Sequence, residues 1–499
     1  MKTLLERKIS LVVIILQFLV SLLVCIYFGT TGLVPVKYMV AIAVVMVVLL
    51  VYQVMSQLTN SSYIFGRVLA VLFCAVFLVG ANYVRESMAA FQNVGGATKK
   101  VDVISFYVMK DDAAKTLADA KNYSFGILRQ QDRENTDKAV QDASKKLNKT
   151  LNTVEYDDPL TMVDALYAKE VQAIIMNKSF VDTVKSQYKT FSTDTRELDT
   201  SKIESEVEEL VDTDVTTKPF NVYISGIDVY GKIGQTSRSD VNIIATVNPV
   251  TKKVLLTSTP RDYYVPLYSK GGKSYSGGMP DKLTHAGMYG IDESAAVLGN
   301  LYGVEADYYA RVNFAGLKKI VDALDGVDVN SDYEFTTVGM AVPNENGDGV
   351  HMAGYTFTKG INHLNGEQAL CFARERHAFD DGDNQRGKNQ MAVIRAIVDK
   401  ASSPAILKGY QKVLDAVSTS FITSLTYEDI SSLVQMQLRD NVHWNITSYS
   451  VSGEGGIEPC YSAGGEELWV MWPNATQINT AKGLIQQVLN GETPTLPQD

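Results

Sequence analysis

The sequence predicts an α/β protein in which a mixed β-sheet flanked by helices follows a small α/β domain and three N-terminal transmembrane helices. Three observations support this fold class. The first 85 residues contain three long apolar runs with almost no charge. Beyond them, short β-branched segments alternate with helical patterns, as is typical of α/β folds. The chain has 499 residues, which is enough for more than one domain of roughly 100–200 residues.

The three apolar runs cover about residues 9–28, 38–55 and 65–84. Each approaches the ~20 residues that a helix needs to cross a bilayer core. No small-residue cleavage site follows at a suitable distance, so the sequence does not indicate a removable signal peptide. Three such runs are too many for the buried helices of a soluble core. Residues 1–85 are therefore expected to anchor a multi-pass protein in the cell membrane.

Basic residues predict the orientation of these helices. Lys2, Arg7 and Lys8 precede the first run, which favours a cytoplasmic N-terminus by the positive-inside rule. Lys37 and Arg67 lie near the two connecting loops and reduce this asymmetry. Three crossings then place the residues after about 85 outside the cytoplasm.

The charge of the chain argues against nucleic acid as a direct partner. The formal net charge is -10, whereas proteins that bind nucleic acid in bulk usually present a basic face. Any cluster of arginines in this chain is therefore expected to be a local site or a solvated surface.

The part after the apolar runs divides into four segments by pattern. Residues 86–100 are predicted as a connector, and 101–195 as an accessory α/β domain of unknown role. Residues 196–219 are polar and charged, so they are predicted as a linker that is partly helical. Residues 220–499 form the second domain. In the accessory domain we expect strands at 101–108, 124–128 and 171–176 and helices at 111–122, 135–147 and 160–168.

The second domain begins with a strand that enters a glycine-containing turn, followed by two β-branched strands around an Asn-Pro turn. Helical patterns recur to the C-terminus. A mixed sheet with helices on both faces is expected. The predicted helices cover 293–302, 314–324, 384–402, about 404–419, about 427–439 and about 476–490.

The segment CFARERHAFDDGDNQRGKNQ, residues 371–390, carries three arginines in an acidic chain. Arg374 and Arg376 are two apart and would share a face on a strand. Arg386 and Gln390 are four apart and would share a helix face, at the head of an apolar stripe. Guanidinium groups suit phosphate or carboxylate oxygens. The alternative is that the arginines pair with the acidic neighbours Glu375, Asp380, Asp381 and Asp383.

A second group of charged residues lies upstream. Arg261 and Asp262 follow a strand, at the kind of position where ligand sites collect in open α/β sheets. Asp228, Arg238 and Asp240 bracket a loop at neighbouring strand ends. Two carboxylates beside several arginines suit a divalent cation together with a polyphosphate, since Mg²⁺ prefers one or two carboxylates, waters and phosphate oxygens.

The order GID…RSD…STPRD…KLTHA…RVNF…ARERH…GDNQRGKNQ resembles the LytR–CpsA–Psr (LCP) family, and most closely its streptococcal CpsA-like capsule members. The resemblance covers residues 220 to about 405. The three apolar runs and the 101–195 segment are also similar to the streptococcal arrangement.

This resemblance implies an LCP-type fold and an extracytoplasmic phosphotransferase. Such an enzyme attaches capsular polysaccharide, as a glycan phosphate, from a polyprenyl-pyrophosphate-linked donor to a sugar hydroxyl of peptidoglycan. It implies Mg²⁺ as cofactor, an apolar pocket for the polyprenyl tail, and other capsule-synthesis proteins as possible partners.

The resemblance also implies roles for individual residues. Asp228 and Asp240 correspond to the acidic residues near the metal. Asp228 or Asp262 is a candidate base, and Arg261 a candidate catalytic residue. Lys282 and His285 lie in a matching segment, Lys282 as a phosphate ligand and His285 equally as a structural histidine. His377 receives no role. The phosphate-binding candidates are Arg238, Arg261, Arg374, Arg376, Arg386, Gln390 and Lys282.

Alternatives remain open from the sequence. One alternative is a membrane regulator of capsule synthesis. Only about eight residues precede the first apolar run and the loop near 56–64 is short, which leaves no cytoplasmic domain large enough to bind DNA, so such a regulator would act through lipid or protein partners. The protein also fits a polyprenyl-pyrophosphate hydrolase, since hydrolysis needs the same phosphate clamp as transfer. Cys371 and Cys460 both lie in the external part, where a disulfide and buried free thiols are alternatives.

Overall fold

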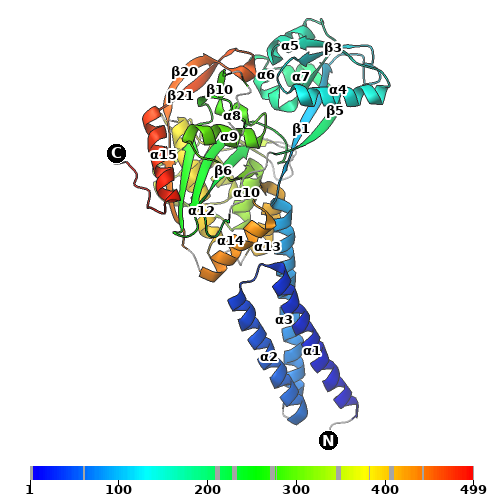
Figure 1. Ribbon diagram of the computed structural model, residues 1–499, viewed down its shortest axis with the longest axis vertical. Helices are drawn as coiled ribbons and strands as arrows, with labels where there is room; N and C mark the ends of the chain where they lie inside the picture. Colours follow the sequence, from blue (N-terminus) through cyan, green and yellow to red (C-terminus); the bar gives the residue numbers. More distant parts are fainter. Residues whose placement is uncertain are drawn as a thin grey trace.

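The computed structural model describes residues 4–59, 62–207, 214–227, 233–269, 276, 278–343, 350–380, 382–403, 409–440 and 443–497. Over these residues the chain forms a helical stalk, a large α/β domain above it and a smaller α/β domain at one side of the top (Figure 1). The order of these parts along the chain is stalk, accessory domain and main domain.

The stalk consists of α1 (Leu4–Thr31), α2 (Val36–Thr59) and α3 (Tyr63–Val94). All three are long and apolar enough to cross a membrane. Most of their large apolar side chains are exposed, as with Val12 at 63% and Leu23 at 64%. Side chains of this kind suit contact with lipid rather than with water. The prediction of three apolar helices is confirmed.

The predicted connector, residues 86–100, is helical in its first part. The helix α3 continues through residues 85–94 and ends only at Gly95. These residues include Ala, Met and Glu, which favour helix. The Ser87 hydroxyl also lies 2.6 Å from the Tyr410 hydroxyl of the main domain, so the extension is held by tertiary contact.

The accessory domain has a five-stranded sheet in the order β3-β2-β4-β1-β5. Helices cover both of its faces: Ala139 and Ala143 of α4 pack with Phe106, and Met162 and Val163 of α5 pack on the other face. The elements are β1 (Lys99–Met109), β2 (Ser124–Leu128), α4 (Arg133–Leu147), β3 (Asn152–Tyr156), α5 (Pro159–Tyr167), β4 (Ala173–Asn177), η1 (Lys178–Phe180), α6 (Val181–Gln187), α7 (Phe191–Asp194) and β5 (Thr195–Glu206).

Two predictions for this part are wrong. Residues 111–122 form turns rather than a helix, because Asp112 and Asp119 accept hydrogen bonds from nearby backbone N–H groups and compete with helical bonding. The charged segment predicted as a linker from 196 is strand β5 up to Glu206, and it pairs with β1 along its whole length. Charged side chains suit β5 because it is an edge strand.

The main domain is built on a six-stranded mixed sheet in the order β18-β11-β6-β7-β8-β19. Strand β6 runs parallel to β11 and antiparallel to β7, and β8 runs antiparallel to β7 and parallel to β19. The strands are β6 (Phe220–Ile227), β7 (Val241–Asn248), β8 (Lys253–Thr259), β11 (Tyr308–Asn313), β18 (Phe421–Thr423) and β19 (Asn445–Ser450).

Helices cover both faces of this sheet, as predicted. On one face, Tyr223, Ile244 and Leu255 pack against α9 (Ile291–Tyr302) and α15 (Ala475–Leu489). On the other face, alternate residues of the same strands pack against α12 and α14. The remaining helices are α8 (Leu283–Ala286), α10 (Phe314–Ala323), α11 (Gly366–Arg374), α12 (Gly382–Ala401), α13 (Tyr410–Ser420), α14 (Tyr427–Asp440) and the 3-10 helix η3 (Tyr461–Ala463).

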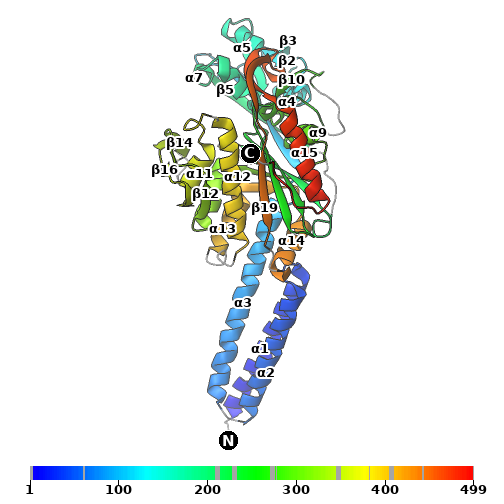
Figure 2. The same ribbon diagram turned by 90° about the vertical axis from the view of Figure 1, so that its left-hand side faces the viewer.

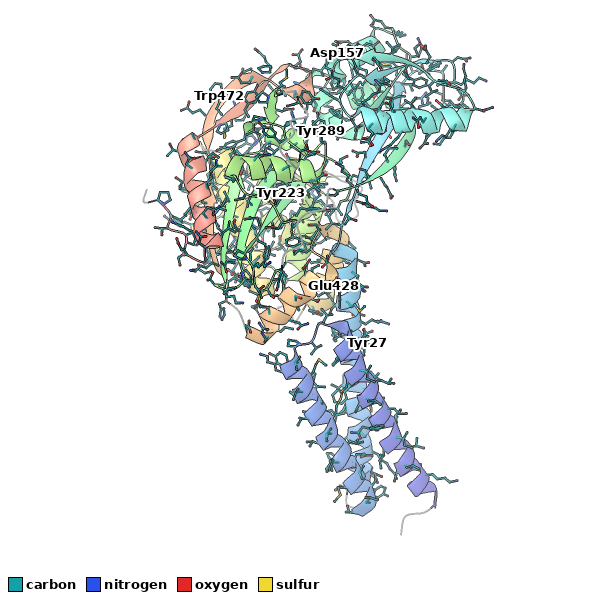
Figure 3. The ribbon with its side chains drawn as sticks, viewed as in Figure 1. Tyr27, Asp157, Tyr223, Tyr289, Glu428 and Trp472 are labelled. Carbon is teal, nitrogen blue, oxygen red and sulfur yellow. The ribbon has the colours of Figure 1, made fainter. Side chains whose placement is uncertain are left out.

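The main domain also contains five short two-stranded sheets among the described residues. They are β9 (Tyr264–Pro266) with β10 (Pro280–Lys282), β12 (Val327–Ser331) with β17 (Gly360–Leu364), β13 (Phe335–Thr336) with β16 (Thr356–Phe357), β14 (Met340–Pro343) with β15 (Val350–Ala353), and β20 (Gly453–Pro459) with β21 (Glu467–Pro473). The glycine-rich hairpin β20–β21 carries Trp472, at the edge of the molecule in Figure 3.

The stalk contacts the main domain directly. Tyr427 at the start of α14 donates a hydrogen bond to the carbonyl oxygen of Thr31 at 2.5 Å, and Tyr38 donates to that of Leu438 at 3.0 Å. Glu428 and Tyr27 mark the two sides of this junction in Figure 3. Figure 2 shows α14 above the ends of α1 and α2. The sheet domain is therefore held next to one end of the three apolar helices.

The two cysteines of the main domain, Cys371 and Cys460, are free and buried. Cys371 and Cys460 belong to separate hydrophobic clusters, so the disulfide alternative is wrong. Burial raises the pKa of Cys371 to about 11 and that of Cys460 to about 12, which keeps both as unreactive thiols.

Candidate functional site

The predicted upstream residues gather at one edge of the main sheet. Arg261 and Asp262 follow the end of β8, and Asp240 immediately precedes the antiparallel strand β7. The Asp240 backbone N–H donates to the Gly226 carbonyl oxygen at 2.8 Å, near the end of β6. Asp228 comes directly after β6, but it lies outside the described residues.

Ion pairs connect these residues. Arg261 Nη1 lies 2.6 Å from Asp240 Oδ1, and Arg261 Nε lies 3.4 Å from Asp262 Oδ2. Lys282 Nζ lies 3.0 Å from Asp262 Oδ1. Burial opposes ionisation of Asp262, but the nearby charges of Lys282 and Arg261 outweigh it, so the pKa of Asp262 lies below its ordinary value. Asp262 is therefore an ionised carboxylate between two cations.

The arginine-rich segment supplies the opposite wall. A cavity of about 370 Å³ is lined by Asp240 and Arg261 on the sheet side and by Arg374, Arg376 and Arg386 across from them. Phe314, His377 and residues 338–341 complete the lining. Four of the predicted phosphate-binding arginines thus meet at one cavity, although Arg261 is far in the sequence from the other three.

The local structure around Arg374 and Arg376 differs from the prediction. Arg374 is the last residue of α11 rather than part of a strand, and Arg376 lies in the loop that follows. The helix forms because Asn365 and Gln368 make a reciprocal capping box at its start. Arg374 lies over the Phe314 ring, 4.7 Å from its centroid, and Arg374 Nη1 donates to the Ala341 carbonyl oxygen at 3.2 Å.

Glu375 has a structural role that the sequence analysis missed. Its side chain is fully buried, and Oε1 accepts hydrogen bonds from three successive backbone N–H groups, of residues 376–378, at 2.6–3.0 Å. Oε2 accepts from Val338 N at 2.8 Å. These bonds hold the Arg376 loop against the residues that line the cavity beside it. Its place inside ARERH was the signal that could have pointed to it.

Arg386 and Gln390 share a face of α12, as predicted. Both line a narrow crevice against the end of β8, together with Asn384, Gly387 and Ser450. A Cβ at position 387 would lie 2.9 Å from Ser258 Oγ, so a larger residue there would require the Ser258 side chain to shift. Arg386 reaches both the crevice and the arginine cavity, whereas Gln390 lines the crevice.

Arg238 lies apart from the arginine cavity. Its Nη2 atom donates to Thr183 Oγ1 of the accessory domain at 2.9 Å, and burial lowers its pKa. It lines a larger cavity of about 800 Å³ between the two domains, which also includes Asp240 and Arg261. No signal in the sequence pointed to Thr183 as its partner.

His285 is a structural histidine in this fold. Its Nδ1 atom lies 2.6 Å from Asp281 Oδ1, and both side chains are buried. Asp281 Oδ2 also accepts a hydrogen bond from the backbone N–H of Ser462 at 2.7 Å. Burial lowers the pKa of His285, so its ring is neutral at neutral pH. The pair ties α8 to the segment after β20.

The acidic residues at the strand ends fit a divalent cation that shares its coordination with substrate. Among the described residues, no group of three or more His, Cys, Asp or Glu side chains forms a closed metal site. Asp240 has one oxygen paired with Arg261, and Asp228 follows the neighbouring strand. Mg²⁺ commonly takes one or two carboxylates and completes its shell with water and phosphate oxygens, so this donor set is suitable.

The comparison with protein families decides the family. The model of the LytR_cpsA_psr family matches residues 181–480, more than half of the chain. The chain belongs to the LytR–CpsA–Psr family. The region matched by the LCP family contains each predicted site residue, and it begins inside the accessory domain at α6.

Two TagU relatives are similar to this chain over part of its length. A polyisoprenyl-teichoic acid–peptidoglycan teichoic acid transferase TagU of Enterococcus faecalis is 35% identical over 219 residues, 43% of this chain and 65% of the relative. A TagU of Bacillus anthracis is 35% identical over 240 residues, 48% of this chain and 71% of the relative. This chain therefore spans about two thirds of the length of these relatives.

Solved structures are also similar. The crystal structure of B. subtilis TagV covers 56% of this chain and 99% of its own, with 26% identity and a TM-score of 0.42. A second family model, described as DNA polymerase processivity factor, matches residues 60–176. That match takes in the apolar helix α3 and covers less than a quarter of the chain, so it assigns no function to the protein.

Proposed function

We propose that this LCP protein is a membrane-anchored phosphotransferase that attaches a glycan phosphate to peptidoglycan outside the cytoplasm. The donor is a glycan linked to polyprenyl pyrophosphate, and the acceptor is a sugar hydroxyl of the wall. One observation carries the proposal: Arg261, Arg374, Arg376 and Arg386 meet Asp240 at one cavity at the ends of the strands. The TagU relatives are named for the transfer of teichoic acid to peptidoglycan, which supports the same reaction class.

The arginine cavity suits the pyrophosphate. Guanidinium groups bind phosphate oxygens through two parallel N–H bonds, and several of them offset the charge of a pyrophosphate. Positive groups that already surround the transferring phosphoryl group stabilise its charge in the transition state without reorganising. The hydrogen bonds to the Glu375 carboxylate hold the Arg376 backbone, and the Phe314 ring supports the Arg374 guanidinium.

The reaction is a substitution at the glycan-side phosphorus. The oxygen of the acceptor hydroxyl forms a bond to that phosphorus, and the bond from phosphorus to the bridging oxygen breaks. Polyprenyl phosphate leaves with the bonding electron pair. A carboxylate takes the proton of the hydroxyl, and the product is a phosphodiester between glycan and wall sugar.

The role of Asp262 follows from its contacts. Asp262 is ionised but enclosed by Lys282 and Arg261, so we assign it to positioning these cations rather than to proton transfer. Asp228 remains the candidate base. Asp228 and Asp240 would hold Mg²⁺, which supplies Lewis-acid neutralisation of the pyrophosphate when it is bound.

We propose capsular polysaccharide as the glycan, on the resemblance of the whole arrangement to streptococcal capsule proteins. The accessory domain and the three apolar helices are part of that resemblance. The teichoic acid named for the relatives is the alternative glycan.

Full-length protein in lipid nanodiscs tests the function. It is incubated with a polyprenyl-pyrophosphate-linked glycan, peptidoglycan fragments and Mg²⁺, and the product is analysed by mass spectrometry. We expect a phosphodiester-linked glycan that disappears with Arg374→Ala plus Arg376→Ala. Free glycan phosphate in place of a linked product would show a hydrolase. Lipid binding without turnover would favour a regulator.

Arg395→Ala is the matched control. Arg395 lies on the same helix as Arg386, is 58% exposed and pairs with Asp399 at 3.9 Å. It does not line the arginine cavity. Its replacement removes one guanidinium from α12 and should leave transfer unchanged.

A further inference from the structure

A second cavity lies between the accessory and main domains, and most of its lining takes no part in the reaction above. It has a volume of about 800 Å³, within the range of roughly 300–1,000 Å³ that is usual for ligand pockets. The accessory domain supplies one wall, from β1, β5, η1 and α6, and the loop between β6 and β7 supplies much of the other. Figure 1 shows the accessory domain beside the upper part of the main domain.

This interdomain cavity adjoins the arginine cavity, because two residues line both. Asp240 and Arg261 line both. A group bound on the arginine side of the Arg261–Asp240 pair therefore has the interdomain cavity as its neighbour. Whatever is covalently attached to the bound pyrophosphate can extend into that space.

The lining of the interdomain cavity is chemically suited to a saccharide. Its charged side chains include five cations and three anions, so it is basic in a chain whose overall charge is -10. Short hydroxyl and amide side chains lie between them and can bond to sugar hydroxyls. The cations are Lys110, Lys178, Arg196, Arg238 and Arg261, the anions Asp182, Glu197 and Asp240, and the neutral polar residues Asn177, Ser179, Ser192, Thr195, Gln235, Thr236 and Ser237.

Contacts between the two domains fix the positions of the two walls of the cavity. Phe180 meets the ring of Tyr289 edge-on at 5.9 Å, and Met288 is buried in the accessory core. Lys100 donates to the Tyr289 carbonyl oxygen at 2.9 Å and pairs with Asp292 at 3.3 Å. Tyr289 is labelled in Figure 3 where the domains meet. A cavity held in this way loses little entropy when it binds a ligand.

We propose that the interdomain cavity binds the glycan of the donor directly beyond the pyrophosphate, and that the accessory domain selects which glycan is transferred. The inference rests on the proposed function. The donor glycan is favoured over the acceptor because it is bonded to the phosphate and must begin beside Asp240 and Arg261. Eight charged side chains in the lining make the cavity less suitable for the apolar polyprenyl tail than for a glycan. An anionic saccharide fits the basic balance best.

Lys110 and Lys178 provide the test. Lys178 Nζ lies 2.7 Å from Glu197 Oε1, and both lysines line the cavity from the accessory side without lining the arginine cavity. The variant is Lys110→Gln plus Lys178→Gln in the full-length protein in nanodiscs. Binding is measured for undecaprenyl pyrophosphate alone and for the same lipid carrying an anionic oligosaccharide.

We expect wild-type protein to bind the glycosylated lipid more tightly than the bare lipid. In the variant this gain should fall by about tenfold, the loss expected for hydrogen bonds to charged groups, while binding of bare lipid is unchanged. An equal gain in variant and wild type would overturn the proposal. A raised KM for peptidoglycan fragments, with donor binding unchanged, would overturn it in favour of an acceptor site.

Lys138→Gln plus Lys145→Gln is the matched control on α4. Lys138 is 43% exposed and pairs with Glu134 at 2.7 Å, whereas Lys178 is 42% exposed with its pair also at 2.7 Å. The control should behave as wild type. Failure of transfer by wild-type protein, with the lysine-dependent gain intact, would reject the transferase and keep the saccharide site. If bare-lipid binding is lost in Arg374→Ala plus Arg376→Ala but not in the lysine variant, the arginine cavity binds the pyrophosphate and the lysines do not.

Discussion

Arg261 Nη1 lies 2.6 Å from Asp240 Oδ1, and this pair forms the wall shared by the arginine cavity and the interdomain cavity. The guanidinium is held by a carboxylate that precedes a different strand, so its position depends on the sheet rather than on a loop. An arginine placed in this way keeps its orientation when a phosphate binds. The pair is the point at which the phosphate chemistry and the saccharide recognition would meet.

Replacing Arg261 with lysine should lower kcat for transfer by about 100-fold or more, the scale seen when one charge-stabilising donor is removed. Lysine keeps the charge but lacks the planar fork that spans Asp240 and a phosphate oxygen. Rates are measured by product formation in nanodiscs, with thermal unfolding as the check on folding. A variant that folds normally and keeps more than about a third of the rate would show that Arg261 does not contact the transferring phosphate.

Replacing Glu375 with alanine should destabilise the main domain by about 2–4 kcal/mol, because four backbone N–H groups lose a charged, buried acceptor. The Arg376 loop should loosen, so KM for the donor should rise. Differential scanning calorimetry measures the first effect and steady-state kinetics the second. Glu334→Gln, at an exposed carboxylate, is the control and should change neither.

The stability of the protein should fall as pH rises from about 4 to about 7 through one group in the accessory domain. Burial, followed by the nearby charge of Asp102, raises the pKa of Asp132 to about 7. The unfolded chain ionises this carboxyl near pH 4, so between these values the folded state binds the extra proton and folding is favoured at the lower pH.

Asp132→Asn isolates this effect. The variant should melt several degrees above wild type at pH 8, where the wild-type carboxylate is charged, and close to wild type at pH 5. The Asn177 amide donates to Asp132 at 2.8 Å and to Asp102 at 2.9 Å, and in the variant it can still donate to the carbonyl oxygen of the substituted side chain. A difference in melting temperature that is the same at both pH values would contradict the prediction.

Removal of divalent cations should abolish transfer, and added Mg²⁺ should restore it. Asp240→Asn should raise the Mg²⁺ concentration required for half-maximal activity by about tenfold, because one of the two expected carboxylate ligands becomes neutral. Asp262→Asn is the comparison, since Asp262 binds Lys282 and Arg261 instead. It should lower the rate without changing the Mg²⁺ requirement. Full activity in excess chelator would remove Mg²⁺ from the proposal.

Long, periodic segments were predictable because their local pattern and their tertiary environment agree. The three apolar helices, the strands β2 and β8, and the helices α12 and α15 lie close to where the sequence predicts them. Ile478, Ala481, Ile485 and Val488 of α15 are buried as their spacing indicates. The grouping of Arg261 and Asp262 at a strand end was also predictable, since it depends only on where one strand stops.

By itself, the sequence determined the apolar stalk, the α/β class and which arginines and aspartates could bind a phosphate, because each depends on local pattern or residue chemistry. Tertiary structure alone decided that β5 is a strand. Its charged sequence does not indicate a strand, and the hydrogen bonds that form it come from β1. Tertiary structure also decided that Arg374 ends a helix and that Arg238 lies outside the arginine cavity and donates to Thr183. Long-range packing brings these groups together, and a distance between residues that are far apart in the chain is not encoded in either segment alone.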